Sequence, residues 1–238
     1  RRGKGQRDEA LEAYKQVLEA NSSHPRHRLS AGNLLRELGN KIEALKYFER
    51  AIVLDSTFTE VYSNMANIYS ETGEHEKAIQ FLEKSIALNP KYAEVYSNMG
   101  NVYYRKGEYQ RAVEYYFEAM RLKPGSADIH YNLGNAYQAL GDHGEAFKSF
   151  DRAARLKPGF RRAENKIAGA LFEQGKFEAA IRRLQQIVVS NPRDAKAFSD
   201  LGSASYRLNQ FGKAIDYYEK AILLRPDLPD PHYYVGNA

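Results

Sequence analysis

Asparagine side chains recur along this chain at a spacing suited to binding a peptide main chain. They form the pairs Asn64 and Asn67, Asn98 and Asn101, and Asn132 and Asn135, with Asn33 before them. Residues three apart lie side by side on one face of a helix. An amide offers donors and an acceptor, which can pair with the main chain of an extended peptide whatever its side chains. Because asparagine is a poor helix former, these residues need a reason other than helix stability.

A basic group follows the asparagines along the chain. Arg162 and Lys166 stand where earlier blocks carry acidic or amide residues, and Lys196 and Arg207 continue the basic stretch. Arg162 falls at the start of a predicted helix, where the helix dipole disfavours positive charge. This placement predicts a protein or peptide ligand that is acidic near the sixth and seventh repeats, at residues 161–228. The alternative is a basic face that is simply solvated.

The elements that must position these residues repeat every 34 residues. The phrase "VYSNMANIYS" begins at Val61, and "VYSNMGNVYY" begins at Val95. Apolar residues at i, i+3, i+4 and i+7 predict a first helix over Thr59–Thr72 and a second over Glu74–Leu88. Gly73 between them suits a turn with positive φ. A single helix pair cannot bury both its faces, so neighbouring pairs are expected to stack.

The repeat register predicts one array over residues 1–238. Full repeats cover residues 25–58, 59–92, 93–126, 127–160, 161–194 and 195–228, and partial repeats cover 1–24 and 229–238. Since both ends match only part of a repeat and the first residue is not Met, we expect a fragment of a longer protein. Ser205 stands where other repeats carry tyrosine, so its repeat is expected to pack less well.

The 34-residue pattern resembles the tetratricopeptide repeat. In the block 93–126 the resemblance is carried by Tyr96, Met99, Gly100, Tyr103, Gly107, Ala112, Tyr116, Ala119 and Pro124. It implies an all-α fold, a right-handed α-solenoid of stacked antiparallel helix pairs, in which the first helices line a concave groove. It therefore implies a non-catalytic protein–protein interaction scaffold. The asparagines fall on the face opposite the core stripe, and an exposed Tyr104 is expected to anchor a partner.

Two resemblances sharpen the interpretation of the site. The asparagine ladder is similar to that of protein O-GlcNAc transferases, whose amides hold substrate backbone. The alternative function is therefore substrate recognition for a larger enzyme, such as a protein glycosyltransferase, whose catalytic domain is not in this chain. A structural alternative has the amides bond between repeats and stiffen the array.

The second resemblance is to the dicarboxylate clamp of chaperone-binding members of the family, which holds acidic C-terminal tails. The residues that match it are Asn101, Asn132, Arg162 and Lys166. Ser97 stands where the clamp has its first lysine, and we favour the solvated basic face over a working clamp.

Composition limits the remaining functions. The 238 residues carry a net charge of +5 and no cysteine, which excludes disulfides and thiol catalysis. No apolar run approaches the roughly 20 residues of a membrane span, and no targeting segment is visible, so we predict a cytoplasmic location. Glu60, Glu94 and Asp128 argue against nucleic acid as a partner. No catalytic, cofactor or metal constellation emerges, His24 and His27 at a helix junction included, and we predict no enzymatic activity for this chain.

Overall fold

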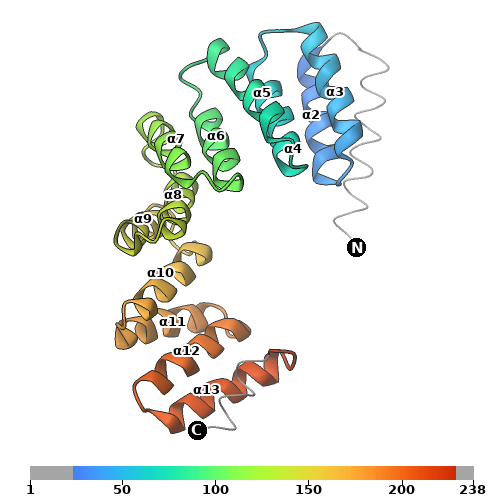
Figure 1. The fold of residues 1–238 in the computed structure, drawn as a ribbon. Helices are drawn as coiled ribbons and strands as arrows, with labels where there is room; N and C mark the ends of the chain where they lie inside the picture. The colour runs from blue at the N-terminus through green and yellow to red at the C-terminus, as the bar shows by residue number, and fades with distance from the viewer. Residues whose placement is uncertain (1–23, 229–238) are drawn as a thin grey trace. The chain divides into compact units, whose positions relative to one another are not determined.

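The computed structural model describes residues 24–228, and helices account for all the regular structure there (Figure 1). The helices form six consecutive pairs: α2 (Pro25–Glu37) and α3 (Lys41–Leu54), α4 (Thr59–Glu71) and α5 (His75–Leu88), α6 (Ala93–Arg105) and α7 (Tyr109–Leu122), α8 (Ala127–Ala139) and α9 (His143–Leu156), α10 (Arg161–Glu173) and α11 (Phe177–Ser190), and α12 (Ala195–Arg207) and α13 (Phe211–Leu224). The predicted all-α fold class is confirmed. The predicted partial repeats, 1–24 and 229–238, lie outside the described residues except for His24.

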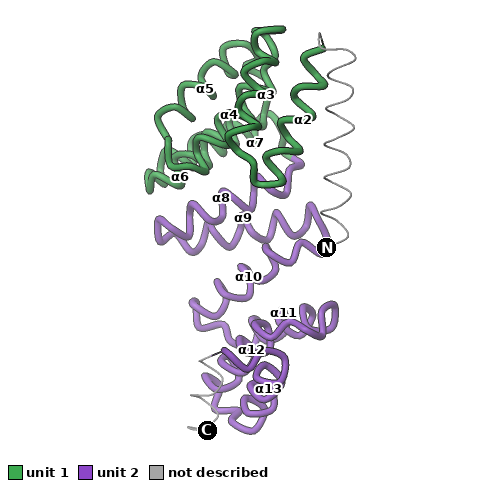
Figure 2. The backbone as a smooth tube through the Cα atoms, turned by 90° about the vertical axis from the view of Figure 1, so that its right-hand side faces the viewer, with its two compact units in different colours: residues 1–124 green, residues 125–238 purple. Residues whose placement is uncertain are grey.

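The chain divides into two compact units, residues 1–124 and residues 125–238 (Figure 2). Unit 1 contains the pairs from α2 to α7, and unit 2 contains those from α8 to α13. Within each unit the two helices of a pair pack together, and each pair packs on the next. In unit 1 the first helices α2, α4 and α6 also contact one another. A single array over residues 1–238 stays a prediction.

The turn inside each helix pair uses a residue with positive φ. Gly73 has a φ of 85°, a conformation that costs glycine little because it has no Cβ. Asn209 stands at the same point of the last pair with a φ of 58°, the one non-glycine residue of positive φ between 24 and 228. Asparagine tolerates this region better than most residues. The turn closes normally, with the N–H of Gln210 donating to the carbonyl of Ser205 at 2.9 Å.

Small residues on the first helices allow the close approach on which the core depends. A Cβ added at Gly134 would lie 2.6 Å from the ring of Phe150, and one at Gly202 would lie 2.6 Å from the ring of Tyr218. Both rings are fully buried. Where glycine occupies the predicted small position, an aromatic ring of the second helix packs directly on the first helix.

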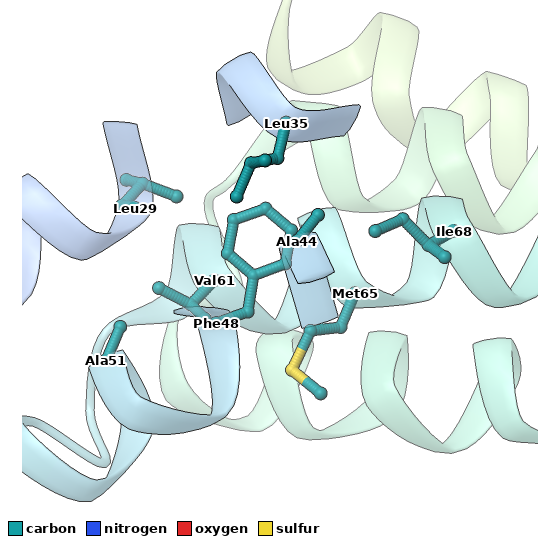
Figure 3. Close-up of a cluster of buried hydrophobic side chains, with 8 residues drawn as sticks. All are labelled: Leu29, Leu35, Ala44, Phe48, Ala51, Val61, Met65 and Ile68. Carbon is teal, nitrogen blue, oxygen red and sulfur yellow. The ribbon is translucent and has the colours of Figure 1, made fainter. Parts of the chain in front are cut away.

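The unit 1 core shows how three successive helices share one cluster (Figure 3). Its buried side chains are Leu29, Leu35, Ala44, Phe48, Ala51, Val61, Met65 and Ile68. They come from α2, α3 and α4, so the cluster joins one helix pair to the next. This is the stacking that the repeat pattern requires, because a lone pair would leave half of these groups in water.

The last helix pair contains a buried hydroxyl without a hydrogen bond. Ser205 is only 1% exposed, and its Oγ has no hydrogen-bond partner among the described residues. A buried hydroxyl without a partner costs free energy. Weaker packing of this repeat stays a prediction.

Candidate binding groove

The asparagines of unit 1 hydrogen-bond between neighbouring repeats. Nδ2 of Asn64 donates to Oδ1 of Asn33 at 2.9 Å, which links α4 to α2. Nδ2 of Asn98 donates to Oγ of Ser63 at 2.9 Å, which links α6 to α4. The structure thus contains hydrogen bonds of the kind expected if the asparagines bond between repeats and stiffen the array. Each bond uses one of the two N–H groups of its donor amide, so the ladder retains hydrogen-bonding capacity for a ligand.

Asn101 has a packing role that sequence analysis missed. The hydroxyl of Tyr116 donates to its Oδ1 at 2.7 Å. Tyr116 is 1% exposed, and burial raises the pKa of its phenol far above the ordinary value. A buried phenol needs an acceptor, and Ser203 accepts from Tyr218 in the same way at 3.2 Å. The sequence feature that could have predicted these bonds is a tyrosine 15 residues after Asn101 and after Ser203.

The asparagines at two other repeats lack that partner. Leu82 and Phe150, which carry no hydroxyl, stand 15 residues after Asn67 and Asn135. The tyrosine contact seen at Asn101 therefore does not account for these two amides. Both are partly buried, as is Asn132, and all three stay predicted ligand contacts.

Tyr104 is more covered than the sequence analysis expected. Its side chain is partly buried, and its ring packs at 5.3 Å between centroids on the ring of Tyr109. The prediction of a fully exposed ring is corrected on this point. The ring of Tyr104 is partly covered because α7 begins at Tyr109, only five residues later, and the Tyr109 ring packs against it.

Unit 2 contains a cavity of about 720 Å³ lined mainly by α8, α10 and α12. Two predicted site residues, Arg162 and Lys166, line it together with Lys196 and Arg207 of the predicted basic stretch. Aromatic side chains from all three helices also line it, namely Tyr131, Phe172 and Tyr206. The carboxylates of Glu173 and Asp200 line it as well, so the cavity combines an excess of positive over negative side chains with aromatic surface.

Lys166 is a partly buried cation of this cavity. Its Nζ donates to Oε1 of Gln138 at 2.7 Å and lies 5.8 Å from the centre of the Phe150 ring. Burial lowers its pKa, because desolvation disfavours the charged form, and Glu173 opposes that shift only in part. Among the described residues no carboxylate forms an ion pair with Lys166. An anion bound beside it would therefore relieve an existing electrostatic cost.

The other cations differ in their partners. Arg207 lies over the ring of Phe177 at 4.9 Å, and Arg162 is exposed. Neither forms an ion pair with a carboxylate between residues 24 and 228. Lys196, in contrast, pairs with Asp200 at 3.1 Å. Three cations of the cavity thus lack a carboxylate partner.

Gly169 lines the same cavity and was missed in the sequence. Other repeats carry asparagine at this position, as at Asn101 and Asn135. A Cβ at Gly169 would meet no atom within 4 Å, whereas one at Gly202 would strike Tyr218. Packing within the chain does not require this glycine, which costs about 1 kcal/mol relative to alanine inside a helix. The sequence could have indicated this residue, because glycine stands at the repeat position where four earlier repeats carry asparagine.

The residues that match the dicarboxylate clamp do not all line one cavity. Arg162 and Lys166 line the unit 2 cavity, Asn132 of α8 is not among its lining residues, and Asn101 belongs to unit 1. Among the described residues there is no cluster of His, Asp or Glu able to hold a metal ion. In the same part of the chain, every helix falls short of the length and apolar character of a membrane span.

Family models identify the repeat. Models described as tetratricopeptide repeat match residues 1–57 and 165–229, 47–80, and 127–160, and one described as TPR repeat matches 66–107 and 100–141. This chain belongs to the tetratricopeptide repeat family. Its TPR repeats support a role as a protein-interaction scaffold.

Several solved structures resemble the chain over 66% of its length or more. YrrB, described as a TPR protein with an unusual peptide-binding site, is 27% identical with a TM-score of 0.67, over 78% of this chain and 96% of YrrB. MamA is 33% identical with a TM-score of 0.54, over 66% of this chain and 91% of MamA. PilF of Pseudomonas aeruginosa has a TM-score of 0.74 at 19% identity, over 98% of this chain and all of PilF, and shows the fold alone. A search of curated protein sequences found no match.

Proposed function

We propose that this TPR chain binds an extended, acidic segment of a partner protein in the unit 2 cavity. The observation that carries the proposal is that one cavity of about 720 Å³ is lined by three cations, Arg162, Lys166 and Arg207, that have no carboxylate partner among residues 24–228. One of them, Lys166, has its pKa lowered by burial. A carboxylate beside it would offset part of that desolvation cost, so charge complementarity favours an acidic ligand.

Several features favour a peptide over a small anion. The cavity extends over three helices, and uncharged polar side chains such as Gln138 and Asn165 line it beside the charges. Amides of this kind pair with the main chain of an extended peptide. YrrB, whose structure is described as having a peptide-binding site, supports the same class of ligand at 27% identity.

We also propose that the asparagine ladder contacts the partner's main chain. The amides concerned are Asn33, Asn64, Asn67, Asn98, Asn101, Asn132 and Asn135, with Tyr104 beside them. The inter-repeat bonds seen in unit 1 hold three of these amides, Asn33, Asn64 and Asn98, in fixed orientations, and a preorganised amide loses less entropy on binding. A cytoplasmic location likewise stays a prediction.

Fluorescence polarisation with labelled ten-residue peptides tests the proposal. The probes are a Glu-rich peptide and matched Gln-rich and Lys-rich peptides. We expect the Glu-rich peptide to bind, and the triple variant Arg162→Gln, Lys166→Gln, Arg207→Gln to weaken binding by about 1–3 kcal/mol, or roughly 5- to 150-fold.

A charge-matched variant separates local contact from the general field of the protein. Lys46→Gln, Lys77→Gln, Arg121→Gln removes the same charge from second helices of unit 1, where each cation pairs only with an exposed glutamate three residues away. It should keep nearly full affinity. Equal losses in the two triple variants would refute the proposed site, as would equal binding of the Glu-rich and Gln-rich peptides.

A further inference from the structure

The unit 2 cavity reaches past the first helices to side chains of the second helices. Leu184 of α11 and Tyr218 of α13 line it, although they are only 2% and 0% exposed as whole residues. The helix contacts explain this depth. α10 packs mainly against α9 and α11, and α12 packs mainly against α11 and α13. Between α10 and α12 the cavity therefore has a floor made by buried core residues.

Two small residues keep this floor accessible. Gly169 of α10 and Ser203 of α12 occupy the position at which four earlier repeats carry asparagine, and both line the cavity. Nothing lies within 4 Å of a Cβ placed at Gly169. An asparagine side chain at that point would project into the cavity and fill part of it. The open space is thus a property of this particular repeat.

The surroundings of that space define the group that fits it. Ala168 and Leu184 supply apolar surface, and the partly buried ring of Phe172, one helical turn beyond Gly169, also lines the cavity. Lys166 and Arg207, which have no carboxylate partner among the described residues, line the same cavity. An apolar side chain gains by leaving water for such surface, while flanking carboxylates can reach the cations.

We infer that the space at Gly169 is a specificity subsite that accepts one large apolar side chain of an acidic peptide. Phenylalanine is the side chain chosen to test it. The Gly169 subsite consists of Gly169, Ala168, Phe172, Leu184, Ser203 and Tyr218. The inference rests on the proposed peptide-binding function and adds a requirement to it. Charge attracts the peptide, and the subsite fixes its register through one buried side chain.

A phenylalanine scan tests the subsite on the full chain. The probes are labelled ten-residue peptides of Glu, Ser and Gly in which one Phe is moved through every position, each matched by a peptide with Ala in its place. We expect at least one Phe peptide to bind the wild type about tenfold or more tightly than its Ala counterpart. Gly169→Asn should bring that ratio close to one. The Phe/Ala ratio is the readout, because an amide at this position can itself contact the peptide main chain and change the affinity for both peptides.

Two further variants control for folding and location. Gly169→Ala, for which the chain has room, should lower the Phe/Ala ratio by a smaller factor than Gly169→Asn. Gly144→Asn makes the same substitution in α9, outside the cavity lining, and should keep the full ratio. Thermal unfolding of each variant shows that it is folded. If Gly169→Asn does not fold, Gly169→Ala decides the question.

The outcomes distinguish the two proposals. A Phe/Ala ratio near one at every position in the wild type, or a ratio that Gly169→Asn leaves intact, overturns the subsite. The proposed function survives that result if the Ala peptides bind and require the three cations. If no acidic peptide of either series binds, both proposals fail.

Discussion

The bond between Asn64 and Asn33 allows a direct test of whether the asparagine ladder stabilises the stack. Nδ2 of Asn64 donates to Oδ1 of Asn33 at 2.9 Å, and the two side chains are partly buried in different repeats. The perturbation is a double-mutant cycle: Asn33→Ala, Asn64→Ala and the two together. The cycle isolates the pairwise interaction, because effects that each substitution has by itself cancel.

The structure sets the expected magnitudes. A neutral hydrogen bond contributes about 0.5–1.5 kcal/mol net, and both groups can rehydrate when the partner is lost because neither is fully buried. Alanine is the better helix former by up to about 0.7 kcal/mol, which offsets much of the loss in each single variant. We therefore expect single variants close to wild-type stability and a coupling energy of about 0.5–1 kcal/mol.

The assay is equilibrium urea unfolding followed by far-ultraviolet circular dichroism at a fixed pH and salt concentration. Its control is the pair Asn33 and Asn67, which lie in different repeats, are not hydrogen-bonded to each other and should show additive effects. A coupling energy below about 0.3 kcal/mol for Asn33 and Asn64 would refute the reasoning. The 2.9 Å bond would then add nothing to the stack, and ligand binding would be the remaining account of both amides.

Two further predictions concern the small residues and the buried lysine. Gly202→Ala forces a Cβ to 2.6 Å from the buried Tyr218 ring and should destabilise the protein by about 1–3 kcal/mol. Gly169→Ala, which meets no neighbouring atom, should instead stabilise it by up to about 1 kcal/mol. Urea unfolding measures both free energies, and similar values for the two variants would contradict the packing described at these glycines. The pKa of Lys166 is lowered by burial, and a bound carboxylate favours its charged form. Above the range in which the peptide's own glutamates titrate, around their ordinary pKa of about 4.3, the affinity for the Glu-rich peptide should therefore be constant until the pH rises through the lowered pKa of Lys166, below 10.5, and should fall there. Lys166→Arg should show a flatter profile in the same polarisation titration. Parallel profiles for the two proteins would exclude Lys166 from the site.

The sequence alone determined the helix pairs and their core. The 34-residue period, the apolar stripes and the small residues are local properties, and each follows from how one helix must face the next. Even Asn209, which breaks the glycine pattern, could be assigned to the turn, because asparagine tolerates positive φ. The basic stretch with Arg162 and Lys166 was also predictable, because the charge of a side chain follows from its residue type.

Only the tertiary structure decided what those polar groups do. Asn64 meets Asn33 across 31 residues of chain, and Asn101 meets Tyr116 across 15, so hydrogen-bond partners depend on stacking rather than on either residue alone. The depth of the unit 2 cavity likewise depends on how α10 and α12 pack on the second helices. In the sequence Gly169 is one glycine of 17. The fold shows that a Cβ at Gly169 would meet no atom within 4 Å and that Gly169 lines the unit 2 cavity, and these two facts together led us to propose the subsite.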